Sequence, residues 1–152
     1  VHRDIKPANV MIDPAKRAIK VTDFGIASVT NACRTRTGMV LGTPSFMSPE
    51  QLAGRRLDGR SDLYSVGVML FQLLTGSLPH TSDSVARLMN QIVNEPAPDV
   101  RTLRPDLPEA LANVVALALE KRPEVRYADG GQLASDLRAV AELMGSRAVA
   151  SS

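Results

Sequence analysis

Two short apolar runs joined by a charged turn constrain how the chain begins to fold. Val10 to Ile12 and Ala18 to Thr22 are both rich in β-branched residues, which favour strands. Asp13-Pro14 and the charged residues that follow mark a turn between the two runs. The pattern therefore predicts a small β-hairpin.

Polar residues of a particular kind stand on both sides of this hairpin. Asp4, Lys6 and Asn9 precede it, and Asp23 follows it directly. Taken singly, each would be an ordinary solvated turn or cap residue. Together they fit what phosphoryl transfer requires of a protein, namely a base, a positive charge and positions that bind metal ions. The ordered set, with a hairpin between its parts, points to that chemistry.

The second half of the chain has a helical period. Residues 26–47 show no sustained period and predict a long surface loop. A short helix over residues 50–53 is expected to end at Gly54, and a longer apolar helix to begin at Asp62, its predicted N-cap, and to end at Leu74.

Three more helices are expected after a turn at Gly76. The first is capped by Ser82 or Asp83, the second runs from Pro108 to Leu119, and the third runs from Gly131 to Met144. Residues 95–108 carry four prolines and predict an irregular segment, while residues 145–152 predict a tail or linker. The residues expected to face inward from the first and third helices are Val85, Leu88, Met89, Ile92, Val93, Leu133, Leu137, Val140, Ala141 and Met144.

Composition indicates one ordinary globular domain. Of the 152 residues, 44% are hydrophobic and 22% are charged, and the net charge of +2 does not argue for a nucleic-acid or membrane partner. No apolar run approaches the roughly 20 residues of a membrane-spanning helix. The single Cys33 excludes an internal disulfide and fits a reducing compartment, either as an ordinary loop residue or as a redox sensor.

The motif His2-Arg3-Asp4 with Asn9, followed by Asp23-Phe24-Gly25, resembles the eukaryotic-type (Hanks-type) serine/threonine protein kinases. Later segments match independently, namely Gly42 to Glu50, Asp62 to Gly67, and Arg126. Ser48-Pro49-Glu50, in place of the commoner Ala-Pro-Glu, resembles the bacterial branch of the family.

The resemblance implies a role for each polar residue around the hairpin. Asp4 would be the catalytic base, and Lys6 would neutralise the transferred phosphate. A lysine at this position resembles serine/threonine kinases and not tyrosine kinases. Asn9 and Asp23 would bind Mg²⁺ with ATP, and the hydroxyl of Thr43 would bridge Asp4 and Lys6.

Other positions are implied to bind nucleotide or to regulate activity. Met11 would form the floor beneath the adenine ring of ATP, although core packing alone would explain its neighbours in the strand. Thr35 and Thr37 resemble the autophosphorylated pair of bacterial kinases, and Arg3 would bind the added phosphate. The alternative is that the threonines and arginines have no regulatory role and only keep an exposed loop soluble.

Five residues are implied to be structural. Glu50 and Arg126 would form a buried ion pair. Asp62 would accept backbone N–H bonds around His2 and the residue that follows it, and His2 would pack against Phe24.

The resemblance covers only part of the family's fold. It implies a mainly α structure, a kinase C-terminal lobe over residues 1–144 with the hairpin beside the catalytic loop, and the N-terminal lobe absent. We therefore expect the parent protein to be an active kinase and the 152 residues alone to be inactive and prone to self-association.

The expected partners follow from the same resemblance. They are protein substrates with Ser or Thr acceptors and the N-terminal lobe of the same parent chain, with a kinase–kinase dimer as a further candidate assembly. No nucleic-acid partner and no membrane segment are expected in this stretch. The expected location is cytoplasmic, and a membrane-anchored parent would hold its kinase domain in the cytoplasm. The alternatives are a non-catalytic kinase-like docking module and a small-molecule phosphotransferase.

Overall fold

Helix α2 (Gly59–Thr75) lies at the centre of the computed structural model, which describes residues 1–24 and 44–150. Its side chains Tyr64, Val68 and Phe71 are almost completely buried. The carboxylate of Asp58 caps the helix by accepting the backbone N–H of Arg60, and the helix ends at Gly76, where φ is 76°. The predicted N-cap at Asp62 is therefore wrong, because Asp62 lies inside the first turn.

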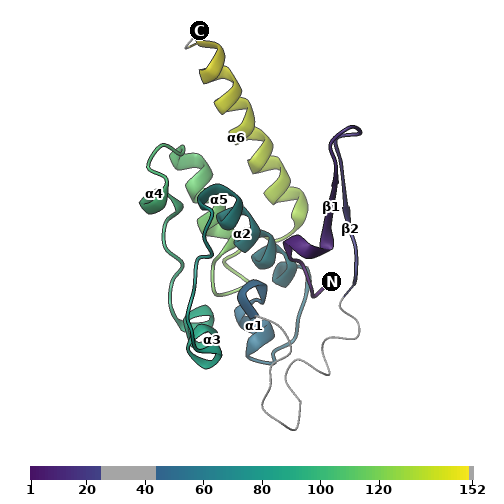
Figure 1. Cartoon of the computed structure of the whole chain (residues 1–152), viewed down its shortest axis with the longest axis vertical. Coiled ribbons are helices and arrows are strands. Elements are labelled where there is room, and N and C mark those ends of the chain that lie inside the picture. Colours follow the sequence, from purple (N-terminus) through teal and green to yellow (C-terminus); the bar gives the residue numbers. More distant parts are fainter. Residues whose placement is uncertain (25–43, 151–152) are drawn as a thin grey trace.

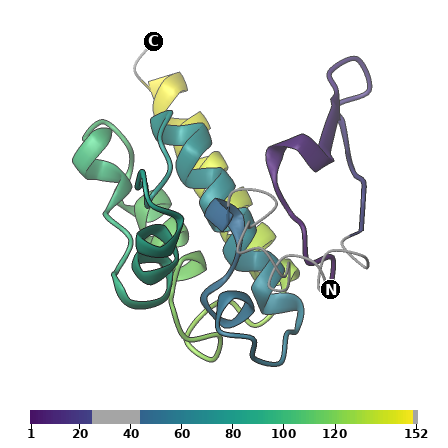
Figure 2. The ribbon, with the colours of Figure 1, turned by 60° about the horizontal axis from the view of Figure 1, so that its bottom comes forward.

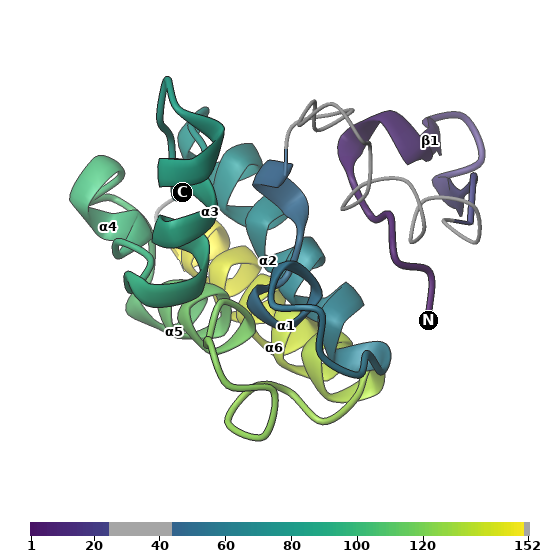
Figure 3. The same cartoon turned by 90° about the horizontal axis from the view of Figure 1, so that it is seen from below.

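The remaining helices pack around α2 (Figure 1). Helices α5 and α6 contact each other and α5 contacts α2, while α3 lies beside α1 and the preceding 3₁₀ turn η3. Their bounds are η3 (Pro44–Phe46), α1 (Pro49–Leu52), α3 (Val85–Asn94), α4 (Val100–Leu103), α5 (Glu109–Ala118) and α6 (Gly130–Ala150). Seen from below, α3 and α4 lie on one side of α2 and the hairpin lies on the other (Figure 3).

The region from α3 to α4 also differs from the prediction. Helix α3 is capped by the hydroxyl of Ser84, and not by Ser82 or Asp83. Helix α4 is a single turn within the segment that the prolines predicted to be irregular, and the carboxylate of Asp99 caps it by accepting the N–H of Arg101. A helical turn therefore forms between the prolines because a local polar side chain caps it, which the proline content alone did not predict.

Helix α6 also departs from its predicted end. It continues past Met144 to Ala150, and Ala141 and Met144, which were predicted to face inward, are exposed. Leu133 and Val140 are buried as predicted. Gly145 does not end the helix, because it does not adopt the left-handed conformation of a helix C-terminus. The residues that follow it, such as Arg147 and Ala148, are compatible with a helix. Within the described part of the chain, no helix has both the length and the apolar character needed to cross a bilayer.

Strands β1 (Val10–Asp13) and β2 (Ala18–Val21) form the predicted antiparallel hairpin, with Val10 opposite Val21 and Ile12 opposite Ile19. It stands to one side of the helices (Figure 2). Core packing was expected to explain the apolar neighbours of Met11 in the first strand, among them Ile12. Instead Met11, Ile12 and Ile19 are 61%, 68% and 70% exposed, so core packing does not account for them in this structure.

The contact between α2 and α5 depends on a residue without a side chain. An added Cβ at Gly67 would lie 2.9 Å from Cβ of Ala118, closer than real Cβ atoms approach. Because Ala118 is fully buried, neither helix can give way without disturbing its other contacts.

We predict that Gly67→Ala destabilises the chain by about 1–3 kcal/mol through this overpacking, despite the better helix propensity of alanine. The measurement is urea unfolding followed by circular dichroism. Gly59→Ala is the matched control in the same helix, since a Cβ there meets nothing within 4 Å. Equal unfolding midpoints for the two variants would contradict the packing account.

A small cluster of buried and half-buried polar groups joins α3 to the segments that precede α3 and follow α5. Lys121 donates from Nζ to the carbonyl of Ile92 at 2.7 Å and to Nε2 of His80 at 3.2 Å. Its ammonium also lies 5.9 Å from the ring centre of Tyr64. Burial, together with the positive charge of Lys121, lowers the pKa of His80 to about 4.

This shift predicts acid sensitivity. The folded state holds His80 neutral, while the unfolded chain binds a proton near the ordinary pKa of 6.5, so stability falls as pH drops from about 6.5 towards 4. The loss should reach roughly 3 kcal/mol. Urea unfolding midpoints measured between pH 7.5 and 4.5 should fall less steeply for His80→Gln, which can still accept a hydrogen bond from Lys121. Parallel pH profiles would contradict this prediction.

Candidate active site

A single carboxylate holds the beginning of the loop over residues 2–9, which we call the Asp4 loop. Oδ2 of Asp62 accepts the backbone N–H of His2 at 2.7 Å, and Oδ1 accepts that of Arg3 at 2.8 Å. Asp62 lies in the first turn of α2, whose inner face is buried in the core. These are the contacts that the sequence predicted for Asp62, and they attach the loop to the core of the protein.

The ring of His2 joins the Asp4 loop to the end of β2. Its Nδ1 accepts the backbone N–H of Asp4 at 3.2 Å, so the proton sits on Nε2, which donates to the carbonyl of Thr22 at 2.8 Å. The ring also packs against Phe24, with centroids 4.5 Å apart, as predicted. His2 is buried and engaged at both nitrogens, an arrangement suited to holding backbone in place.

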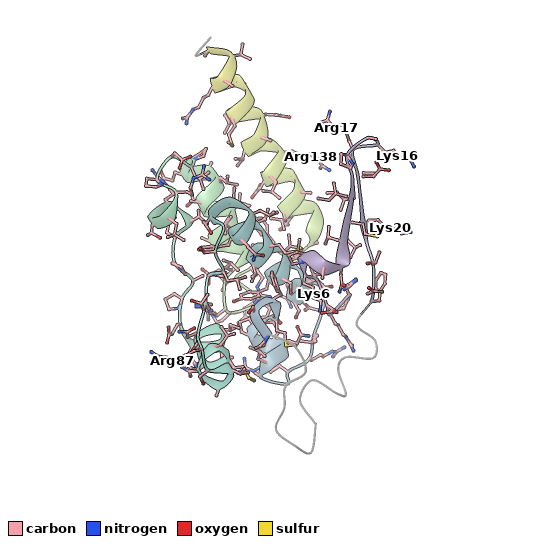
Figure 4. The ribbon with its side chains drawn as sticks, in the orientation of Figure 1. Lys6, Lys16, Arg17, Lys20, Arg87 and Arg138 are labelled. Carbon is pink, nitrogen blue, oxygen red and sulfur yellow. The ribbon has the colours of Figure 1, made fainter. Side chains whose placement is uncertain are left out.

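The side chains of Asp4, Asn9 and Lys6 lie together. Nδ2 of Asn9 donates to the carbonyl of Asp4 at 2.8 Å and to its Oδ2 at 3.0 Å. Nζ of Lys6 lies 3.6 Å from Oδ1 of Asp4. The 3₁₀ turn η1 (Pro7–Asn9) produces this geometry by folding Asn9 back over the loop. Figure 4 shows Lys6 beside this turn, on the side of the molecule that carries the hairpin.

The hairpin brings Asp23 to the same site. The backbone N–H of Thr22 donates to the carbonyl of Asn9 at 2.8 Å, which extends the pairing of β1 and β2 to the site's edge. Asp23 follows immediately and is exposed. Two residues far apart in sequence, Asn9 and Asp23, are thus neighbours across the open end of the hairpin.

Two residues of this site have left-handed backbone conformations. The φ angles are 70° at Arg3 and 54° at Asp23. For a residue with a side chain, this region costs about 1–2 kcal/mol, and such strain gathers at functional sites. The surrounding hydrogen bonds offset it at Arg3, because Asp62 fixes the N–H of that residue.

The oxygen atoms available here suit a magnesium ion. Asn9 uses its amide nitrogen on Asp4, which leaves Oδ1 as an acceptor, and Asp23 contributes a carboxylate. Mg²⁺ prefers oxygen ligands and is commonly bound by one or two protein groups together with substrate phosphates. Among the described residues, no group of three or more His, Cys, Asp or Glu side chains forms a complete metal cage. The residues present fit a magnesium ion that phosphates help to hold.

The predicted ion pair between Glu50 and Arg126 forms in the interior of the protein. Nη1 and Nη2 of Arg126 donate to the two carboxylate oxygens of Glu50 at 2.8 and 3.2 Å, and both residues are 5% exposed. Ser61 donates its hydroxyl to Oε1 of Glu50 at 2.6 Å. Arg126 further donates to the carbonyls of Arg60 and Glu120, so the pair joins α1, α2 and the segment after α5.

Burial alone would raise the pKa of Glu50, but the hydrogen bonds from Arg126 and Ser61 outweigh it, and the pKa lies below its ordinary value. The carboxylate is therefore charged in the folded protein at neutral pH. Its stabilising effect is present above the unfolded pKa near 4.5 and is lost as pH falls below that value.

The structure leaves some of the predicted site residues untested. Thr35, Thr37 and Thr43 lie outside the described residues, as does Cys33. Met11 lies on β1 opposite Lys20 and is exposed, so no packing within the described part of the chain assigns it a role.

Two contributors were missed by reasoning from the sequence. Ser61 binds Glu50, and Nε2 of Gln51 donates to the carbonyl of Arg3 at 3.1 Å. Gln51 directly follows the predicted Ser48-Pro49-Glu50 motif, which is the only signal that could have drawn attention to it.

Comparisons with known proteins identify the family of this chain. Residues 1–136 match the family model described as "Protein kinase domain". The chain is 43% identical over 150 residues to "Serine/threonine-protein kinase pkn3" of Myxococcus xanthus, a match covering 92% of the chain and 27% of that relative.

Two further relatives are similar to the same degree. "DNA damage-responsive serine/threonine-protein kinase RqkA" of Deinococcus radiodurans is 42% identical over 136 residues, which cover 88% of the chain and 20% of the relative. "Serine/threonine-protein kinase PknL" of Mycobacterium tuberculosis is 40% identical over 143 residues, which cover 93% of the chain and 36% of the relative. The matched region therefore spans only 20% to 36% of the length of these curated relatives.

Removing the charge of Glu50 should be strongly destabilising. Glu50→Gln leaves Arg126 charged and buried without a counter-ion, and we expect a loss of about 3–5 kcal/mol in urea unfolding at pH 7. The control is Asp106→Asn, which breaks the exposed pair with Arg104 and should leave the midpoint unchanged. A Glu50→Gln midpoint equal to that of the control would show that the buried pair does not stabilise the fold.

Proposed function

Because this chain belongs to the protein kinase family, we propose that it forms the C-terminal lobe of a serine/threonine protein kinase, transferring the γ-phosphoryl group of ATP to protein hydroxyls. One observation carries the proposal. Asp4 is held by Asn9 and lies beside Lys6, on a loop that Asp62 fixes to α2. The bacterial relatives, all named as serine/threonine-protein kinases, support Ser and Thr as the acceptors.

Asp4 acts as the base in this proposal. Its carboxylate accepts the proton of the substrate hydroxyl, whose oxygen attacks the γ-phosphorus while the bond to the bridging oxygen of ADP breaks. Asn9 orients the carboxylate through its bond to Oδ2, and Lys6 offsets negative charge on the transferred phosphoryl group.

Asn9 and Asp23 hold magnesium in this proposal, through Oδ1 of the amide and through the carboxylate. The bound ion neutralises charge on the phosphates of ATP. The hydrogen bond from the backbone N–H of Thr22 to the carbonyl of Asn9 keeps the two ligands close together. Met11 lies one residue into β1, and its exposed side chain is available to the adenine ring.

The exposed apolar side chains of the hairpin support the proposal that a second lobe of the parent protein covers them. Ile12 and Ile19 form an apolar pair on one face of the hairpin, and a second lobe that covers the ATP site would lie close to it. Regulation by phosphorylation of Thr35 or Thr37, with Arg3 as the phosphate-binding residue, belongs to the same proposal.

The proposal predicts that the full-length parent protein phosphorylates Ser- and Thr-containing protein substrates. Asp4→Asn should lower kcat at least about 100-fold, because the base is lost while the side-chain shape is kept. Asp13→Asn is the matched control, since Asp13 lies on the same hairpin and its carboxylate binds the exposed Lys16. The assay follows transfer of labelled phosphate from ATP at saturating Mg²⁺.

Wild-type activity that persists in Asp4→Asn would contradict the assignment of the base. For the 152 residues alone we expect no transfer, because kinases also require a Gly-rich loop and a lysine that bind the ATP phosphates. Transfer by the purified chain that is lost in Asp4→Asn would refute that expectation.

A further inference from the structure

The backbone of Arg3 is held from both sides by different helices. Its N–H donates to Asp62 of α2 at 2.8 Å, and its carbonyl accepts the side-chain amide of Gln51 of α1 at 3.1 Å. Between these two contacts lies the left-handed φ of 70°. Since such a conformation persists only where the surroundings impose it, both contacts matter for the residue that follows, Asp4.

Gln51 is well placed to impose this conformation because its own backbone is fixed. Its N–H donates to the hydroxyl of Ser48, the buried N-cap of α1. The preceding residue, Glu50, is held by the buried ion pair with Arg126. The amide of Gln51 therefore extends from a rigid support to the loop that carries Asp4.

We propose that Gln51 is a positioning residue, whose side-chain amide holds the Arg3 carbonyl and so sets the orientation of the Asp4 carboxylate. The peptide unit between Arg3 and Asp4 has this carbonyl at one end and the N–H of Asp4 at the other. The N–H is bound to His2, so the peptide unit is fixed at both ends. The catalytic part of this inference rests on the proposed phosphoryl transfer.

The contact also links two parts of the site. Helix α1 follows the 3₁₀ turn η3, and Gln51 is its one residue that donates a side-chain hydrogen bond to the Asp4 loop within the described part of the chain. A displacement of α1 would release the Arg3 carbonyl and loosen Asp4. Gln51 would then make the geometry of the base depend on the position of α1.

Two substitutions separate the hydrogen bond from the size of the side chain. Gln51→Met keeps the length but removes the donor, and Gln51→Lys keeps a donor that can reach a carbonyl. Methionine and lysine are similar to glutamine in helix propensity, so α1 should not be perturbed.

The first test needs no activity and uses amide hydrogen exchange measured by NMR on the 152-residue chain. In Gln51→Met, the amides of Arg3 and Asp4 should exchange about fivefold faster than in the wild type. In Gln51→Lys they should stay within about twofold of the wild type. The reference amides are those of Val114 and Val115 in α5, which should not change in either variant.

The second test measures steady-state kinetics of the full-length protein. Gln51→Met should lower kcat roughly tenfold and leave KM for ATP nearly unchanged, because misplacing the base affects the transition state more than binding. Gln51→Lys should recover most of the lost kcat.

Unchanged exchange at Arg3 and Asp4 in Gln51→Met would overturn the positioning role. Faster exchange throughout the chain in both variants would also overturn it, since Gln51 would then serve general stability. A normal kcat in Gln51→Met would overturn the catalytic part. An inactive wild-type protein would instead count against the proposed function, and the exchange experiment would still decide whether Gln51 holds the loop.

Discussion

The carboxylate of Asp62 is the interaction on which the geometry of the site depends. It accepts two consecutive backbone N–H groups, those of His2 and Arg3, from a position in the first turn of α2. A charged acceptor makes such bonds shorter and stronger than neutral ones. The loop is thereby attached to a helix whose side chains Tyr64, Val68 and Phe71 lie in the core. Catalytic groups need this kind of support, because small errors in their placement lose much of the rate.

A second set of buried contacts fixes the opposite side of the loop. The pair formed by Glu50 and Arg126 joins α1 to the segment after α5, and Gln51 extends from that support to Arg3. A buried ion pair is seldom a large net gain in stability, because desolvation opposes it. Here it places α1, and the hydrogen bonds of Ser61 and of the backbone carbonyls complete its polar environment.

Much of this arrangement could be predicted from the sequence. The hairpin followed from β-branched runs around an Asp-Pro turn, and the contacts of Asp62, Glu50 and His2 followed from the resemblance to protein kinases. The predicted helix start at Asp62 was wrong because its carboxylate binds the Asp4 loop and leaves capping to Asp58.

Other features could not be predicted because their causes lie elsewhere in the chain. Gln51 and Arg3 are far apart in sequence, and no periodicity relates them. Ile12 is exposed although core packing was expected to account for it, because the hairpin stands to one side of the helices (Figure 2). Helix α6 continues past Met144 because nothing local ends it, and its last turns lie outside the core.

The central claim, that Asp62 holds the Asp4 loop for phosphoryl transfer, is tested most directly by comparing two acids at the start of α2 in the full-length protein. Asp62→Asn should lower kcat at least about 100-fold, because one of the two accepted N–H bonds is lost and the charge is removed. Asp58→Asn should keep kcat within about twofold, since asparagine is an equally good N-cap. A wild-type kcat in Asp62→Asn, or an equal loss in both variants, would contradict the account.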